Sequence, residues 1–193
     1  MILFNGVEEL DVVGPWEVFQ EAAQLNNNFS CRMISYDGKD VSAAKGLQMG
    51  VHGSMAEDLI YDLILLPGGR GTRALMKNEA FLARLHVLAK NATWVTSVCT
   101  GSLVYATAGL LANKKCTSHH AACDALEALN MTGEVLRNIR YVQDDKYITA
   151  AGVSAGIDMS LWLLGQIEEP AFAKKVQHAI EYYPQPPYAE HEK

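Results

Sequence analysis

The chain has 193 residues, and 16 Lys and Arg against 22 Asp and Glu give it a formal net charge of -6. Hydrophobic residues make up 49% and charged residues 20%, which excludes intrinsic disorder and predicts a single globular domain over residues 1–193. An acidic chain without a run of Lys or Arg lacks the positive surface that nucleic acids and anionic membranes require. We therefore expect a small-molecule partner, with no role for nucleic acid or a membrane.

The sequence also lacks the usual signals of export. No apolar run approaches the roughly 18 residues that cross a bilayer, and no basic stretch precedes the short apolar start that ends at Asn5. Four cysteines in a chain of this length are too sparse for a disulfide-stapled secreted domain. They are Cys31, Cys99, Cys116 and Cys123. We expect a cytoplasmic protein with reduced thiols.

Short apolar or β-branched runs alternate with longer helical patterns in the first part of the chain. The pattern predicts strands at 1–4, 29–36, 63–66 and 94–98, and helices at 11–25, 72–89 and 100–111. Alternation of this kind predicts an α/β fold, with a mostly parallel sheet covered by helices on both faces. The runs 63–66 and 94–98 are nearly continuous in apolar and β-branched residues, so we expect them to be central strands.

The last third of the chain predicts a hairpin and two helices. A polar turn separates two short strands, and Pro170 stands where a new helix can begin. The pattern gives strands at 139–142 and 147–150 and helices at 154–167 and 170–181. Three prolines then prevent further helix, so we expect an extended tail held by Tyr183 and Tyr188.

Ligands of open parallel sheets bind beyond the carboxyl ends of the strands, and two turns there carry chemistry. Residues 66–71 read Leu-Pro-Gly-Gly-Arg-Gly, a segment that turns tightly and exposes backbone N–H groups. Residues 97–102 place Cys99 between a central strand and a Gly-Ser helix start, the setting of a nucleophile elbow. The positive end of that helix lowers a thiol pKa from about 8.5, which predicts a Cys99 thiolate at pH 7. A buried core cysteine is the structural alternative.

Two further side chains are candidates for proton transfer. Asp11 follows the first strand and therefore lies on the same rim as Cys99, where burial and a neighbouring thiolate raise a carboxyl pKa and make it a proton donor. Its structural alternative is a helix cap. His119 follows a short run at 116–118, and a histidine in that position is more often structural.

Taken together, the segments resemble the ThiJ/PfpI superfamily, whose domain is like that of class I glutamine amidotransferases. The resemblance covers nearly the whole chain and is closest to the bacterial isonitrile hydratases. It depends on the order and spacing of six segments, at 9–19, 66–72, 96–101, 117–119, 155–158 and 183–188.

The resemblance implies a flavodoxin-like three-layer sandwich, a homodimer, and catalysis by Cys99 with Asp11 as its acid partner. Backbone amides at Gly69 and Thr100, beside Gly68, would form an anion-stabilising pocket. The thiolate would attack the terminal carbon of R–N≡C to give a thioimidate, which water converts to an N-substituted formamide without metal or organic cofactor.

His119 matches the histidine of the family and is expected to support the reaction rather than to act as its base. The next position departs from the relatives, since many have Trp where this chain has His120. That difference bears on the shape of the pocket and on the choice of substrate.

Alternative functions remain open at this level. Within the superfamily, Cys99 also suits glyoxalase-like or amidase-like chemistry, or a stress-protective redox sensor. A small-molecule-sensing module is a third class, although only eleven residues follow Tyr182, too few for a helix-turn-helix segment.

Two other motifs compete with Cys99. Residues 152–156 satisfy the G-x-S-x-G pattern of serine hydrolases, with Asp158 and His178 as the available partners, but an acid one helical turn from Ser154 is poorly placed. Four potential zinc ligands also occur close together, in a spacing that matches no common zinc module. They are Cys116, His119, His120 and Cys123.

Overall fold

The computed structural model describes residues 1–57 and 59–188 and shows a mostly parallel sheet between two layers of helices. The central sheet has the strand order β5 (Leu63–Leu66), β6 (Trp94–Val98), β10 (Tyr147–Ala150) and β9 (Tyr141–Asp144). The first three strands are parallel, and β9 is antiparallel to β10. The sequence-based fold class is therefore confirmed.

A parallel pair, β1 (Ile2–Leu3) and β2 (Ile34–Ser35), continues this layer, with β1 packed beside β5. The two predicted central strands thus have neighbours on both sides. Their register pairs Leu66 with Ser97 and Ala150 with Val98, so β5, β6 and β10 end at nearly the same level. The loops that follow these three strands consequently meet at one edge of the sheet.

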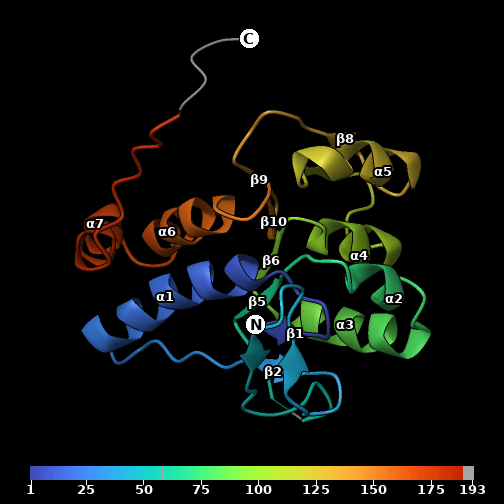
Figure 1. Cartoon of the computed structure of the whole chain (residues 1–193), viewed down its shortest axis with the longest axis horizontal. Coiled ribbons are helices and arrows are strands. Elements are labelled where there is room, and N and C mark those ends of the chain that lie inside the picture. Colours follow the sequence, from blue (N-terminus) through green and yellow to red (C-terminus); the bar gives the residue numbers. More distant parts are fainter. Residues whose placement is uncertain (58, 189–193) are drawn as a thin grey trace.

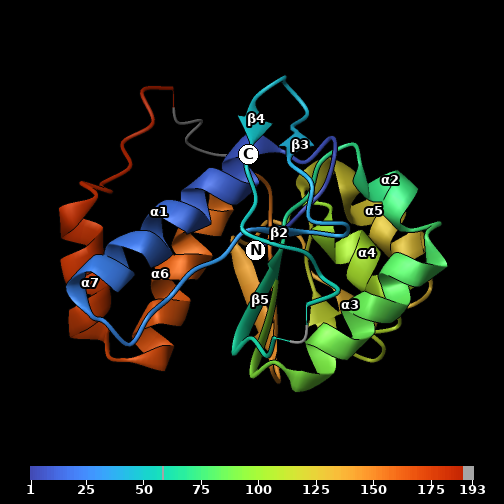
Figure 2. The ribbon, with the colours of Figure 1, turned by 90° about the horizontal axis from the view of Figure 1, so that it is seen from below.

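Helices cover both faces of the sheet, as Figure 2 shows. One face carries α1 (Glu9–Leu25), α6 (Ala155–Ile167) and α7 (Pro170–Ala179). The other face carries α2 (Thr72–Leu75), α3 (Glu79–Asn91), α4 (Gly101–Thr107) and α5 (Cys123–Ala128).

The expected helix over 72–89 is interrupted, and Asn78 explains the break. Its side chain accepts a hydrogen bond from the Phe81 N–H at 3.0 Å, which caps α3 and ends the continuity with α2. Phe81 and Leu85 then bury one face of α3 in the hydrophobic core that also contains residues of β5 and β6. The Asn78 cap therefore divides into two helices a segment whose apolar pattern predicts one.

Several short elements carry no clear sequence signal, because two- and three-residue segments have no measurable period. They are β3 (Val41–Ser42), β4 (Gln48–Met49), β7 (Lys115–Cys116), β8 (Glu134–Val135) and a 3-10 turn at His120–Ala122. The expected strand at 29–36 is also reduced to β2.

The predicted hairpin is present, and its second strand is as expected. The first strand, β9, lies two residues later than the predicted 139–142, so the turn to β10 has two residues instead of four. In the tail, Tyr183 Oη lies within hydrogen-bonding distance of His178 Nδ1, at 2.9 Å, so Tyr183 contacts the last turn of α7. Tyr188 is 93% exposed, so its predicted anchoring role is wrong. No helix in the described ranges is long and apolar enough to cross a membrane.

Candidate active site

Cys99 lies at a strained turn between β6 and α4. Its φ of 57° is in the left-handed region, which non-glycine residues seldom adopt. Both backbone groups are fixed: the N–H donates to the Ala151 carbonyl at 2.7 Å, and the carbonyl accepts from Ser102 Oγ at 3.0 Å and Ser118 Oγ at 2.9 Å. The predicted elbow is therefore present, and three separate segments hold it in place.

Asp11 faces this turn from the first turn of α1. Its side chain is fully buried, and Oδ2 accepts a hydrogen bond from the Gly68 N–H at 2.8 Å. The other oxygen, Oδ1, is buried and accepts no hydrogen bond of good geometry among the described residues. The residue that caps α1 is Glu8, so the alternative of Asp11 as a helix cap is wrong.

Burial raises the pKa of Asp11 to about 7, and the charge of Glu8 adds to the effect. The N–H groups of Gly68 and Val153 oppose this shift, and so does the Cys99 thiol, which lies close enough to act as a weak donor. Since the ordinary pKa of Asp is 3.8, this carboxyl is poised to exchange a proton at neutral pH.

The thiol itself differs from the expectation. Burial, followed by the charge of Asp11, raises the pKa of Cys99 to about 12. The N–H and hydroxyl of Thr100 lower the Cys99 pKa but do not outweigh these effects. The prediction of a lowered thiol pKa is wrong here, because the start of α4 is buried and burial disfavours the charged thiolate more than the helix end favours it. The Asp11 carboxyl loses its proton before the thiol does.

The predicted anion pocket is also arranged differently. The Gly69 N–H donates to Thr100 Oγ1 at 3.0 Å, and the Gly68 N–H is committed to Asp11. Of the two expected donors, the Thr100 amide acts on the sulfur and the Gly69 amide does not. The glycines therefore position side chains around Cys99 instead of offering free amides.

His119 follows Ser118, whose hydroxyl donates to the Cys99 carbonyl. Its Nδ1 accepts from the Ala121 N–H at 3.2 Å, which places the ring proton on Nε2, and the ring centroid is 4.2 Å from that of His120. Burial and then the neighbouring His120 lower the pKa of His119, which favours the neutral ring. The ring packs closely on Gly152, where an added Cβ would lie 2.1 Å from Cδ2. This geometry suits a supporting group rather than the base for Cys99.

Comparison with known proteins agrees with this geometry. The DJ-1/PfpI family profile matches residues 1–166. Isonitrile hydratase from Pseudomonas putida is 35% identical over 187 residues, which cover 97% of this chain and 79% of the relative. The chain belongs to the DJ-1/PfpI family.

Solved structures of this family show the same architecture. A ThiJ/PfpI family protein from Pseudomonas syringae has a TM-score of 0.89 at 30% identity, over 97% of this chain and 76% of that one. DJ-1beta from Drosophila melanogaster has a TM-score of 0.82 at 20% identity, over 95% and 96% of the two chains. The second likeness is one of fold alone.

Thr72 is a further neighbour of the site in this DJ-1/PfpI chain, and no sequence pattern singled it out. It is fully buried, its hydroxyl donates to the Gly69 carbonyl at 2.7 Å, and it accepts from Arg73 Nη1 at 2.9 Å. Its Oγ1 also lies 3.3 Å from Thr100 Oγ1. A threonine directly after the glycine segment was the available signal, but its burial depends on the packing of α2 against α4.

The serine-hydrolase alternative is not assembled. Ser154 is exposed and accepts from Arg140 Nη2 at 3.2 Å, while Asp158 accepts from Arg140 and from Tyr182. His178 instead contacts Tyr183. The three residues of the supposed triad thus have separate partners.

The zinc alternative is not assembled either. No three His, Cys, Asp or Glu side chains in the described part of the chain are placed to hold a metal ion. Cys123 Sγ instead contacts the carbonyl oxygens of Ser118 and His119, at 3.7 and 3.6 Å. These are weak sulfur contacts within the protein interior.

Proposed function

We propose that this protein is a cysteine-dependent hydratase, which adds water to small isonitriles to give N-substituted formamides. The observation that carries the proposal is the pair formed by the Cys99 thiol on its strained elbow and the buried Asp11 carboxyl, whose pKa of about 7 suits a proton carrier. The similarity to isonitrile hydratase supports the substrate class.

The first step forms the covalent intermediate. The Asp11 carboxylate takes the thiol proton as Cys99 Sγ attacks the terminal carbon of R–N≡C, and the same proton then passes to that carbon. The product is a thioimidate, R–N=CH–S–Cys99. Because the proton moves from sulfur through the Asp11 carboxyl to carbon, the site carries one negative charge throughout the step. No additional charge has to form in the buried site.

The second step releases the product. Water adds its hydroxyl to the thioimidate carbon, while Asp11 passes the remaining proton to nitrogen. The resulting R–NH–CH(OH)–S–Cys99 collapses, the C–S bond breaks, and the hydroxyl proton returns through Asp11 to sulfur. The net reaction is R–N≡C plus water to R–NH–CHO, with the thiol and carboxylate restored.

Burial distinguishes this proposal from a redox-sensing role. Cys99 is only 7% exposed and its thiol pKa is raised, whereas susceptibility to oxidation follows exposure and thiolate character. Hydratase chemistry requires the thiolate only during attack, when Asp11 accepts the proton. Glyoxalase-like or amidase-like chemistry would use the same pair and differs in substrate.

Turnover of an alkyl isonitrile tests the proposal. Purified protein should convert n-butyl isonitrile to N-butylformamide, detected by mass spectrometry, and Cys99→Ala should lose the activity. Cys116→Ala is the matched control, because Cys116 is a buried cysteine on β7 with no place in the proposed steps. Full activity in Cys99→Ala, or no turnover by the wild type, would contradict the proposal.

A further inference from the structure

A cavity of about 320 Å³ lies next to the elbow, between the 117–123 segment and the loop that leads into β9. Neither Asp11 nor Thr100, which act on the Cys99 sulfur, lines this cavity. Two of its lining residues, however, form hydrogen bonds with the Cys99 backbone. Ser118 donates to the Cys99 carbonyl, and the Ala151 carbonyl accepts from the Cys99 N–H. The cavity thus borders two residues that hydrogen-bond to the backbone of Cys99.

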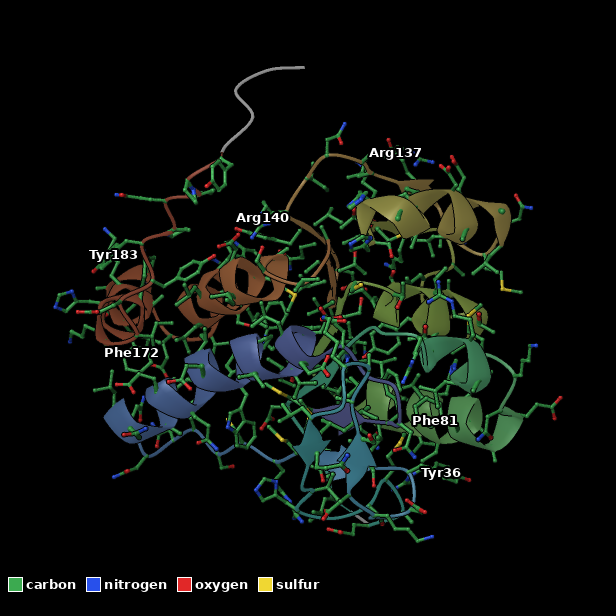
Figure 3. The ribbon with its side chains drawn as sticks, viewed as in Figure 1. Tyr36, Phe81, Arg137, Arg140, Phe172 and Tyr183 are labelled. Carbon is green, nitrogen blue, oxygen red and sulfur yellow. The ribbon has the colours of Figure 1, made fainter. Side chains whose placement is uncertain are left out.

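The titratable side chains that line the cavity are mostly basic. Two arginines and two histidines line it, and none of its lining residues is Asp or Glu. These basic residues are His119, His120, Arg137 and Arg140. Figure 3 shows Arg137 beside α5 and Arg140 beside α6. Such a lining suits an anionic group of a ligand.

The two arginines differ in how firmly they are held. Arg140 pairs with Asp158, whose side chain is 27% exposed, and also donates to Ser154, so it ties β9 to the start of α6. Arg137 pairs at 2.8 Å with Asp124 and Glu127, whose side chains are 92% and 65% exposed. Ion pairs exposed to this degree add little to the stability of the fold.

Because these exposed carboxylates compete weakly, a ligand carboxylate can replace one of them on Arg137. The planar guanidinium has five N–H donors, so it can bind a second carboxylate while it keeps a first. The exposed His120 imidazole adds a donor to the same cavity.

We propose that the cavity binds a carboxylate on the R group of the substrate, so the substrate class is isonitriles that carry an acidic group. The inference rests on the proposed hydratase function for its reaction and on Arg137 and His120 for its specificity. The proposal requires the isonitrile carbon to reach Cys99 Sγ past Ser118 and Ala151, which line the cavity and hydrogen-bond to the Cys99 backbone.

Binding of a product analogue tests the cavity without turnover. N-formylglycine, the formamide expected from isocyanoacetate, should bind about tenfold more tightly than its methyl ester in a calorimetric or NMR titration. Arg137→Gln should abolish this preference and His120→Gln should reduce it. Arg32→Gln removes an arginine–glutamate pair that does not line this cavity and should leave the preference unchanged.

Kinetics then connect the cavity with the reaction. Isocyanoacetate should have a KM about tenfold below that of methyl isocyanoacetate, and Arg137→Gln should remove the difference with little effect on kcat for the ester. Equal affinity for N-formylglycine and its ester, or an anion preference that survives Arg137→Gln, would overturn the proposal.

The two proposals fail in different ways. If N-formylglycine binds as expected but neither isonitrile is hydrated, the hydratase function fails and the cavity remains a carboxylate site. If both isonitriles are hydrated equally well and no binding preference is found, the hydratase function stands and the acidic substrate class is wrong.

Discussion

Two turns at the same edge of the sheet perform opposite tasks. The turn after β6 presents a side chain, the Cys99 thiol, on a backbone that hydroxyls and a carbonyl hold in a strained conformation. The turn after β5 presents almost no side chains, and its Gly68 and Gly69 N–H groups donate to Asp11 and Thr100. The glycine turn is therefore the frame for the reactive turn.

Close approach explains why the frame consists of glycine. A Cβ on Gly68 would lie 2.5 Å from the Thr100 nitrogen and 2.7 Å from Cys99 Cβ. Gly69 has a φ of 121°, a conformation that side chains rarely adopt. The elbow can approach closely only because Gly68 has no side chain, and the Gly69 N–H depends on Thr100 for its acceptor. A substitution in either turn should therefore change the geometry of both.

Asp11→Asn should have the largest effect, because it removes the proton carrier but keeps the acceptor for the Gly68 N–H. Turnover should fall by about 10²–10⁴-fold, the usual contribution of general acid–base catalysis. In the wild type, kcat/KM should rise as the pH passes about 7, where Asp11 ionises. A rate that falls through the same range would show that the protonated carboxyl is the active form.

The same substitution should stabilise the fold at high pH. The folded pKa of Asp11, about 7, is above the ordinary value of 3.8, so the wild type loses stability as the pH rises from about 4 to 7. Asp11→Asn does not ionise, and its advantage in the free energy of unfolding should grow over that range to roughly 4 kcal/mol. Denaturant titrations at pH 4 and pH 8 measure this. An advantage that is equal at both pH values would contradict the raised pKa.

Gly68→Ala tests the frame. The added methyl group meets backbone atoms of the elbow, so we expect a loss of about 1–3 kcal/mol in stability together with reduced turnover. Gly165→Ala in α6 is the matched control, because its nearest contacts would be ordinary ones at 3.5 Å. This control should be neutral or stabilising, and equal losses in both variants would remove the special role of Gly68.

Thr72→Val should have the smallest effect. It deletes the hydroxyl that joins the Gly69 carbonyl to the Thr100 hydroxyl, at a cost of about 0.5–1.5 kcal/mol per hydrogen bond. The rate at which iodoacetamide alkylates Cys99 at pH 8 should change as well, since the Thr100 hydroxyl acts on the thiol. Thr107→Val removes a similar hydroxyl bond within α4 and should change stability alone.

The sequence predicted those features that depend on long periodic segments and on chain order. The central strands, their helices and the meeting of Asp11 with Cys99 follow from the alternating pattern and from the shared edge of parallel strands. The direction of the Cys99 pKa shift did not follow, because it depends on burial that only the packed structure provides. The engagement of the Gly69 amide by Thr100 likewise depends on one backbone angle.

Trapping the covalent intermediate tests the central claim most directly. Protein mixed with excess n-butyl isonitrile and quenched in acid within milliseconds should yield a peptide spanning Cys99 whose mass is increased by one isonitrile, and this adduct should be absent in Cys99→Ser. Hydration of the isonitrile that continues in Cys99→Ser, or an adduct found only on Cys31, Cys116 or Cys123, would contradict the account.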